Sequence, residues 1–287
     1  MNSSIHTPIV KVRDSHPTET EDIIAVEEPL EIILESGSHN DRTSRNLAVT
    51  MRTPGNDVEL ALGFIFTEGI INRYDEVNKI EHDTTSCTED KQNRILVSLH
   101  EHIVPNLSNT ERNFYTTSSC GVCGKASINA IRTINTSRHH FTNEGQIDGD
   151  IFLGLPNMLL NQQKIFAETG GLHSSAIFNH HGELLLLRED VGRHNALDKL
   201  IGSCLAQKDF YFEHSILLLS GRASFELIQK AVMAGISVVA AIGAPSSLAV
   251  SLAKEFGISL VGFLRNNRFN IYAGEQRIKI KSHENSY

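Results

Sequence analysis

The chain has 287 residues, of which 40% are hydrophobic and 21% are charged, and its formal net charge is −8. This length allows one or two domains with a full core, and the composition excludes wholesale disorder. The acidic excess excludes a general nucleic-acid binder, and four cysteines are too few for a disulfide scaffold. We therefore expect a protein of a reducing compartment, the cytoplasm, with neither a secretory signal nor a membrane span.

Polarity and periodicity divide the sequence into five segments. Residues 1–27 are polar and aperiodic, which predicts a flexible N-terminal tail, and residues 276–287 predict a C-terminal tail. Between them, we expect a small α+β subdomain over residues 28–115, a mobile segment and linker over 116–149, and a larger α/β domain over 150–275.

The first half of the chain predicts three strands and a helix. The apolar runs Leu30–Leu34, Leu47–Met51 and Ile95–Leu99 favour strands. A turn with proline and glycine precedes Asp57, which is a suitable N-cap for an amphipathic helix that Gly69 would end.

The second half alternates strands and helices. A hairpin is predicted between Ser174–Phe178 and Glu183–Leu187, followed by a helix whose apolar face includes Cys204, so we expect that cysteine in the core. The following segments, in chain order, are a strand at Ile216–Leu219, a helix at Ser224–Ala234, a strand at Val238–Ile242, a helix at Ser246–Phe256, and strands at Leu260–Leu264 and Arg268–Tyr272. This β-α-β-α-β order predicts parallel strands with right-handed crossovers.

Two cysteines form the most distinctive local motif, Cys120-Gly121-Val122-Cys123, followed by Gly124 and Lys125. The nearby lysine and a predicted helix start both favour thiolate, and the glycines leave room for a bulky partner. We favour a nucleophilic thiol pair. Two alternatives stay open: a metal site completed by histidines, although a second CxxC motif is absent, and an incidental pair.

A zinc deaminase needs a His-x-Glu motif followed by Pro-Cys-x-x-Cys. Here His181-Gly182-Glu183 follows the cysteines, lies in a predicted hairpin turn, and no proline precedes Cys120. The order and the context are both wrong for that chemistry.

Polar segments follow the three predicted parallel strands. Arg222 lies in the first, in Ser220–Ser224, and Arg265 and Arg268 bound the last, while Gly243–Ser247 is the middle one. Because ligands bind at the carboxyl ends of parallel strands, and arginines and helix N-termini hold anions, we expect a phosphate-binding edge. The alternative is that these residues only form caps and turns.

A further polar group, His173, Asp190, Arg193 and His194, borders the predicted hairpin and the helix after it. These side chains can line a pocket or exchange protons. The alternative is structural: Asp190 or Asn195 caps the helix and Arg193 forms a salt bridge.

Six segments together carry a family resemblance. They are Ser-Ser-Cys-Gly-Val-Cys-Gly-Lys-Ala-Ser (118–127), Thr-Gly-Gly-Leu-His-Ser (169–174), Glu-Asp-Val-Gly-Arg-His-Asn-Ala-Leu-Asp-Lys (189–199), Ser-Gly-Arg-Ala-Ser-Phe-Glu (220–226), Gly-Ala-Pro-Ser-Ser-Leu-Ala (243–249) and Gly-Phe-Leu-Arg-Asn-Asn-Arg-Phe-Asn-Ile-Tyr (262–272). In this order they resemble the FdhD family of formate dehydrogenase accessory sulfurtransferases.

The resemblance implies both a fold and an activity. It implies a cytidine deaminase-like three-layer sandwich, without the deaminase zinc site, as the cofactor-binding domain. A cysteine desulfurase would pass persulfide sulfur to Cys120, with Cys123 as its companion. The acceptor would be molybdenum cofactor, in its bis-molybdopterin guanine dinucleotide form, before insertion into formate dehydrogenase, and a guanine nucleotide would mimic it.

Cofactor binding is assigned to two sets of residues. By motif position, the family's cofactor-binding stretch maps to Phe263, Leu264, Arg265, Asn266, Asn267 and Arg268. To these the strand-edge argument adds Ser220, Gly221, Arg222 and Ser224, and the polar group near the hairpin adds His173, Arg193 and His194. No resident metal is expected, and a homodimer is the expected assembly.

Two other functions stay open. One is a cofactor chaperone without sulfur chemistry. The other is a thiol–disulfide oxidoreductase, although the segment before Cys120 is polar rather than the strand of a thioredoxin-like unit.

Overall fold

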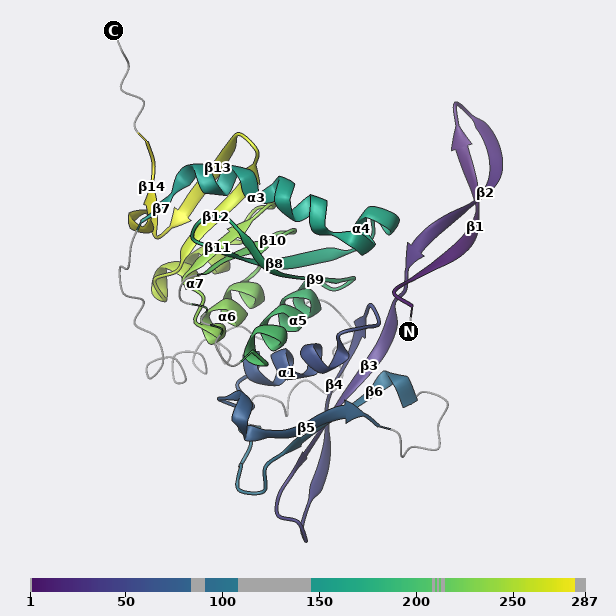
Figure 1. The fold of residues 1–287 in the computed structure, drawn as a ribbon, viewed down its shortest axis with the longest axis vertical. Helices are drawn as coiled ribbons and strands as arrows, with labels where there is room; N and C mark the ends of the chain where they lie inside the picture. Colours follow the sequence, from purple (N-terminus) through teal and green to yellow (C-terminus); the bar gives the residue numbers. More distant parts are fainter. Residues whose placement is uncertain are drawn as a thin grey trace.

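The computed structural model describes residues 2–83, 91–107, 146–207, 210, 212 and 215–281. It is a mixed α/β fold with a six-stranded sheet, a four-stranded sheet and helices between them, as Figure 1 shows. The predicted α/β class is confirmed.

The larger sheet has the strand order β13-β12-β11-β10-β8-β9. Its strands are β8 (His173–Asn179), β9 (Leu184–Asp190), β10 (Ser215–Leu219), β11 (Val238–Ala241), β12 (Ser259–Arg265) and β13 (Arg268–Ala273). β10, β11 and β12 are parallel, while β8, paired with β10, and β13, paired with β12, are antiparallel to them. The predicted hairpin, parallel series and closing strand are all confirmed.

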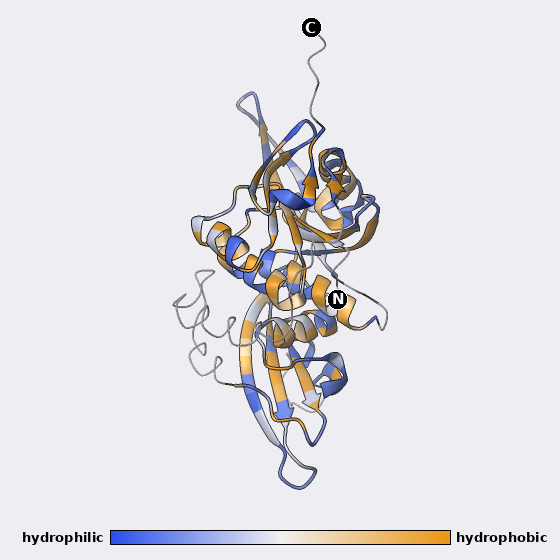
Figure 2. Cartoon of the chain, turned by 90° about the vertical axis from the view of Figure 1, so that its left-hand side faces the viewer, coloured by the Kyte–Doolittle hydropathy of each residue, from blue (hydrophilic) through white to orange (hydrophobic). Residues whose placement is uncertain are grey.

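Helices cover both faces of this sheet. The crossover helices α6 (Phe225–Ala234) and α7 (Ser247–Glu255) lie on the same side as α5 (Arg193–Leu205), and α3 (Gly149–Gln162) lies on the other side, followed by α4 (Lys164–Thr169). Phe152, Leu155 and Leu159 of α3 are fully buried against the strands. Figure 2 shows the hydrophobic stretches in the strands and in the helices packed between the two sheets.

The smaller sheet has the order β4-β3-β6-β5. Its strands are β3 (Glu28–Ser36), β4 (Thr43–Arg52), β5 (Val77–His82) and β6 (Arg94–Leu99), and short 3-10 helices precede β5 (Tyr74–Glu76) and β6 (Lys91–Asn93). The three strands predicted in this half are confirmed.

Helix α1 (Asp57–Thr67) starts differently from its prediction. The N-cap is Asn56, in the left-handed conformation with φ 58°, and Asp57 is the first helical residue. The Asp57 carboxylate instead forms an ion pair with buried Arg52, at 3.0 Å from its Nε. A buried guanidinium needs a charged partner more than a helix needs a side-chain cap, which is why the expected cap is absent.

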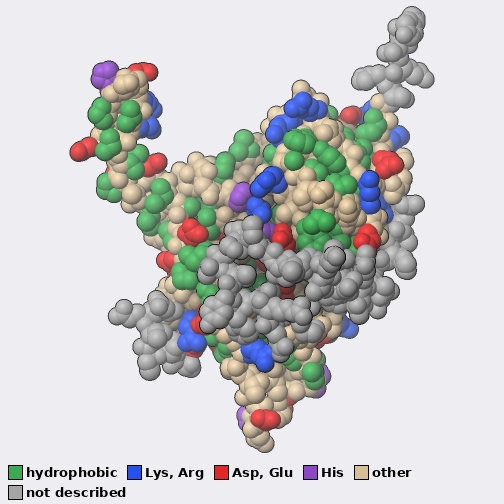
Figure 3. All heavy atoms as spheres, turned by 180° about the vertical axis from the view of Figure 1, so that it is seen from behind, with side chains coloured by type: hydrophobic (Ala, Val, Ile, Leu, Met, Phe, Trp, Pro, Cys, Tyr) green, Lys and Arg blue, Asp and Glu red, His purple; other side chains and the backbone are tan. Residues whose placement is uncertain are grey.

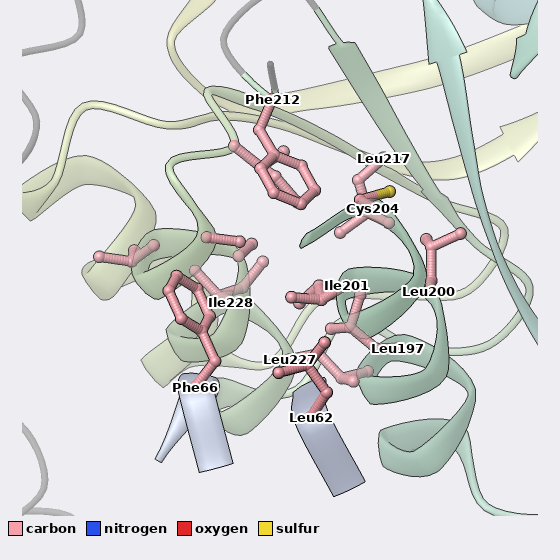
Figure 4. Packing of buried hydrophobic residues seen from close by; sticks show 14 of the residues in the cluster. Leu62, Phe66, Leu197, Leu200, Ile201, Cys204, Phe212, Leu217, Leu227 and Ile228 are labelled. Carbon is pink, nitrogen blue, oxygen red and sulfur yellow. The ribbon is translucent and has the colours of Figure 1, made fainter. Parts of the chain in front are cut away.

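The two sheets share one hydrophobic core, because α1 packs directly on α5. A Cβ on Gly63 would lie 1.9 Å from the backbone oxygen of Asp198, and a Cβ on Gly202 would lie 1.9 Å from that of Glu59. Only glycine permits this approach. Around it, side chains of α1, α5 and α6 interlock (Figure 4), and Cys204 is 1% exposed among them, which confirms its predicted place in the core.

The predicted N-terminal tail is wrong. β1 (Ser4–Arg13) and β2 (His16–Ala25) form an antiparallel hairpin that projects from the molecule, closed by Asp14 and Ser15 at positive φ. Its side chains are mostly exposed, so the pattern of buried and exposed positions that reveals most strands is missing.

The C-terminal boundary also needs correction. We expected a tail from residue 276, but a 3-10 helix covers Glu275–Arg277 and β14 (Ile278–Lys279) pairs in parallel with β7 (Ile147–Asp148). Ile278 is buried there. Among the helices that the structure describes, none has the length and apolar character needed to cross a membrane.

Candidate functional site

The carboxyl ends of β10, β11 and β12 lie at one edge of the larger sheet, because these strands are parallel. β8 is antiparallel to β10 and begins at this edge, and β9 is antiparallel to β8 and ends there. The segments after all three parallel strands, His173 at the start of β8 and the turn after β9 therefore converge. We call this edge, with those segments, the strand-end rim.

Backbone hydrogen bonds tie the rim segments together. The Gly243 N–H donates to the Gly221 carbonyl at 2.8 Å, the Ser246 N–H to that of Ala223 at 2.9 Å, and the Phe263 N–H to that of Gly243 at 3.0 Å. A Cβ on Gly243 would lie 2.8 Å from the Gly221 oxygen, so this position needs glycine. These hydrogen bonds hold the backbone segments of the rim at fixed distances from one another.

Four predicted arginines lie at or beside the rim. Arg222, Arg265 and Arg268 are exposed, and Arg193 is partly buried in the first turn of α5. The Nε of Arg193 is buried, and no hydrogen-bond partner for it exists among the described residues. Figure 3 shows Lys, Arg and His side chains close together on one face. The predicted salt bridge of Arg193 is absent from the described part of the chain.

The exposed side chain of Arg265 also links the ends of two strands. Its Nη1 donates to the carbonyl of Ile242 at 2.7 Å and to that of Leu264 at 2.8 Å, joining the ends of β11 and β12. The neighbouring Asn266 donates through Nδ2 to Oδ1 of Asn157 on α3, and Asn267 is exposed.

Phe263 and Leu264 differ in the exposure of their side chains. Phe263 is 41% exposed and has a positive φ of 52°, at an irregularity in the pairing of β12 with β13. An exposed aromatic ring on strained backbone is typical of a binding position. The Leu264 side chain is fully buried in the core, so only its backbone can reach a ligand.

The two helix N-termini at the rim differ in their capping. At α6, the N-cap Ser224 makes no side-chain cap hydrogen bond, and its Oγ lies 3.5 Å from Nε2 of His194. At α7, Ser246 Oγ accepts from the Ala249 N–H at 3.2 Å. The sequence argument assigned part of the anion binding to these termini. That assignment stays a prediction.

His173 and His194 lie on the same side of the rim. The pKa of His173 is lowered because its ring is half-buried, and the charges of Arg193 and His194 lower it further, against an opposing effect of Asp190. Nε2 of His194 lies 3.6 Å from Oε2 of Glu226 and 3.5 Å from Oγ of Ser224. These contacts hold the pKa of Glu226 at about 2.

A buried polar cluster supports the rim from below. Asp190 is fully buried, lies 2.7 Å from Nζ of Lys199, and accepts hydrogen bonds from the N–H groups of Thr53 and Gly192 and from the Asn195 side chain. Burial raises the pKa of Asp190, and the Lys199 ammonium opposes this. The predicted cap is wrong, because the N-cap of α5 is Gly192 and no side chain caps the helix. Asp190 instead joins Thr53, which follows β4, to the turn that carries Arg193 and His194.

Sequence reasoning assigned no role to Glu226, Lys199 or Thr53. Glu226 stands within one of the quoted motifs, but 32 positions separate it from His194, and only the packing of α5 beside α6 brings them together. Lysines are mostly exposed in proteins, and no local pattern in the sequence indicates that Lys199 is buried.

Cys120 and Cys123 lie outside the described residues, as do the other residues of their motif. Among the residues that the structure describes, no three His, Cys, Asp or Glu side chains gather closely enough to hold a metal ion.

A family model, that of the FdhD/NarQ family, matches residues 25–279. The chain belongs to this family. The resemblance expected from the sequence motifs is thereby confirmed. The N-terminal hairpin lies almost wholly before the part that the FdhD/NarQ model matches.

Relatives extend the similarity over nearly the whole chain. A "Sulfur carrier protein FdhD" of Streptomyces avermitilis is 44% identical over 96% of this chain and 95% of its own length. One of Mycolicibacterium paratuberculosis is 48% identical over 89% and 91%. One of Sulfolobus acidocaldarius is 39% identical over 95% and 97%.

A solved structure shares the fold. It is a crystal structure described as that of a formate dehydrogenase accessory protein from Desulfotalea psychrophila. The TM-score is 0.72 at 25% identity, with 97% of this chain and all of that chain covered.

Proposed function

We propose that the protein is a sulfur carrier for formate dehydrogenase maturation. It accepts persulfide sulfur from a cysteine desulfurase on Cys120 and passes it to molybdenum cofactor, as the bis-molybdopterin guanine dinucleotide, before the cofactor enters the apoenzyme. The names of the relatives and of the structural neighbour support this role. The motif position supports the choice of Cys120, with Cys123 as its companion.

The observation that carries the acceptor side is the strand-end rim. The chain has a net charge of −8, yet Arg193, Arg222, Arg265 and Arg268 lie at or beside one sheet edge. Guanidinium groups bind phosphates through paired hydrogen bonds, and the guanine dinucleotide arms of the cofactor carry phosphates. Binding these arms at the rim would position the metal end for sulfur transfer.

The first transfer follows ordinary thiol chemistry. The Cys120 thiolate attacks the terminal sulfur of the donor's persulfide. The donor's S–S bond breaks, its cysteine leaves as a thiolate, and Cys120 now carries the persulfide. In thiol exchange, the Cys123 thiolate attacks the outer sulfur of this persulfide, the bond between that sulfur and Cys120 breaks, and Cys120 leaves as a thiolate while Cys123 carries the persulfide.

We also propose a cytidine deaminase-like sandwich for the larger domain. The support is the order β9-β8-β10-β11-β12, with β8 antiparallel to three parallel strands and helices on both faces. A homodimer is the proposed assembly, since two-fold assemblies are the commonest, and sedimentation velocity tests it.

The decisive experiment is transfer of radioactive sulfur from a cysteine desulfurase to the purified protein. We expect label on the unaltered chain and on a Cys204→Ala control, whose thiol is buried, but none on Cys120→Ala. Formate dehydrogenase maturation should fail with the same variant. Undiminished labelling of Cys120→Ala would remove that residue from the role.

The same variants separate the two other functions. A cofactor chaperone without sulfur chemistry would mature formate dehydrogenase normally with either cysteine replaced. A thiol–disulfide oxidoreductase would reduce insulin and would need both cysteines for that activity.

A further inference from the structure

The smaller sheet holds the start of α5 through residues 50–53, at and just after the end of β4. The Asn195 side chain of α5 donates a hydrogen bond to the carbonyl of Met51 at 2.8 Å. Its Oδ1 accepts a hydrogen bond from the Thr50 hydroxyl at 3.1 Å. These contacts fix the helix just after the two rim residues in its first turn.

Thr53 fixes the chain on the other side of those two residues, before α5 begins. Its Oγ1 accepts a hydrogen bond from the N–H of Val191 at 3.1 Å. Its own N–H donates to Oδ2 of Asp190 at 3.1 Å, and its carbonyl accepts from Nζ of Lys199 at 2.7 Å. Thr53 is 1% exposed, so solvent does not compete for these partners. Its hydroxyl, N–H and carbonyl therefore all connect the smaller sheet to the region around the rim turn.

The position of Arg193 depends on this turn, because Arg193 is the first residue of α5 and follows the turn directly. Burial lowers the pKa of His173 at the start of β8, and the charge of Arg193 beside it lowers that pKa further. A paired hydrogen bond from a guanidinium to a phosphate depends on the direction of the guanidinium plane as well as on its charge. A small displacement of the turn would therefore weaken the contact of Arg193 with a phosphate.

We propose that Thr53 is a positioning residue for Arg193, and that the smaller sheet thereby determines how tightly the strand-end rim holds a phosphate group. The Thr53 hydroxyl acts through the backbone of the turn, at the N–H of Val191, and does not touch the ligand. This rests on the proposed function, because it takes the phosphate-bearing ligand at the rim from there. Coupling between two sites is reciprocal, so a bound ligand also stabilises the contact of Thr53 with the turn.

Two substitutions of Thr53 separate the effect of its hydroxyl from that of its volume. Thr53→Val keeps the shape of the side chain but removes the acceptor for the Val191 N–H. We expect it to weaken the binding of GDP and of inorganic pyrophosphate by about tenfold, the size of one charge-assisted hydrogen bond. Thr53→Ser keeps the hydroxyl and should restore the affinity of the unaltered chain. Isothermal titration calorimetry measures both ligands, and undiminished affinity of Thr53→Val would overturn the proposal.

Thr67 is the matched control, because it is another threonine with 1% exposure whose hydroxyl has buried charged partners. Its Oγ1 donates to Oδ1 of Asp198 at 2.8 Å and accepts from Nζ of Lys230 at 2.9 Å, where α1, α5 and α6 pack together. Thr67→Val should lower the melting temperature and leave the affinity for GDP unchanged. Equal losses of affinity in Thr67→Val and Thr53→Val would show a general effect of destabilisation and overturn the proposal.

A double variant shows whether Thr53 acts through Arg193. Arg193→Gln lacks the guanidinium that Thr53 positions, so adding Thr53→Val to it should cause little further loss of affinity. A tenfold loss in the unaltered background together with a much smaller loss in this one supports the proposal. The same loss in both backgrounds would show that Thr53 acts through another group and would overturn it. Arg193→Gln that binds like the unaltered chain would do the same.

Hydrogen exchange of the unaltered chain tests the coupling without any variant. Saturating GDP should slow deuterium uptake by the peptide that covers residues 50–53, because the ligand stabilises the bond from the Thr53 N–H to Asp190. A peptide that covers β5, in the same sheet, is the control and should change less. Unchanged uptake over residues 50–53 in a chain that binds GDP would overturn the proposal, even if Thr53→Val does not fold.

Failure of the inference and failure of the proposed function give different results. If the unaltered chain accepts labelled sulfur and binds GDP, but Thr53→Val binds GDP as tightly, only the inference fails. If the unaltered chain binds neither GDP nor pyrophosphate, the inference fails together with the rim as the cofactor site. If Cys120 accepts no sulfur while the Thr53 results hold, the sulfur-carrier function alone fails.

Discussion

At the scale of single residues, the exposed arginines of the strand-end rim differ in what else they do. Arg268 is exposed, whereas Arg265 also donates to the carbonyls that end β11 and β12. We expect Arg268→Ala and Arg265→Ala each to weaken GDP binding by about 1–3 kcal/mol, the value of a charge-assisted hydrogen bond. Arg265→Ala should lower the melting temperature as well, and Arg268→Ala should not. Unchanged titration curves for both would place the ligand elsewhere.

Asp190 offers a stability test at the same scale. Asp190→Asn leaves the Lys199 ammonium buried without its counter-charge, so we expect a loss of about 3–5 kcal/mol in urea denaturation. Replacing both residues, Asp190→Asn with Lys199→Met, removes the buried charge and should recover part of this loss. A single variant as stable as the unaltered chain would show that the pair contributes nothing.

Cys204 gives a prediction about pH. Burial raises the pKa of its thiol from 9.0 to about 12. The folded chain therefore holds this proton where the unfolded chain releases it, so stability should fall as pH rises from 9.0 towards 12. Cys204→Ala should flatten that part of the stability curve. Iodoacetamide at pH 8, read by peptide mass mapping, should leave Cys204 unmodified until the chain unfolds, and rapid native labelling would contradict its burial.

At the scale of helices and strands, α1 and α5 cross at close range through Gly63 and Gly202. Gly63→Ala or Gly202→Ala would place a Cβ 1.9 Å from backbone oxygen, so the helices must separate. We expect each to cost at least about 2 kcal/mol in denaturant unfolding, as overpacking does. Gly154→Ala on α3 is the matched control, because nothing lies within 4 Å of its added Cβ, and it should stabilise by about 0.5–1 kcal/mol.

Elements that bury apolar side chains were predictable, and elements that bury few were not. β10, β11 and β12 are apolar runs between glycine-ended helices, so both the elements and their parallel order followed from the sequence. The N-terminal hairpin buries little, and its turn residues, Asp14 and Ser15, lack the glycine that marks most such turns. No local signal therefore distinguished it from a loose tail.

The site was predictable where it depends on strand ends and not where it depends on packing between helices. The convergence of Arg222, Arg265 and His173 follows from strand direction alone. The pairing of His194 with Glu226 and of Asp190 with Lys199 needs the positions of α5 and α6 in space. Charged residues that pair across a long separation in the sequence follow no regular spacing, so the sequence alone does not reveal the pair.

At the scale of the whole molecule, the hairpin of β1 and β2 is an appendage. It projects from the body, meets it through α4, and lies almost wholly before the part matched by the family model. Deleting residues 2–24 should therefore leave the far-UV circular dichroism of the remainder intact and change the melting temperature by only a few degrees, since little apolar surface is lost. Loss of cooperative melting would show that the hairpin belongs to the core.

The buried cluster around Asp190 has a consequence for building hybrids between relatives. Its groups come from both sheets: Thr53 follows β4 of the smaller sheet, while Asp190, Asn195 and Lys199 belong to the larger sheet and its helix. A chimera that joins the first half of one homologue to the second half of another inherits only part of this set from each parent. Such grafts should yield soluble protein only when both parents carry matching residues at these four positions.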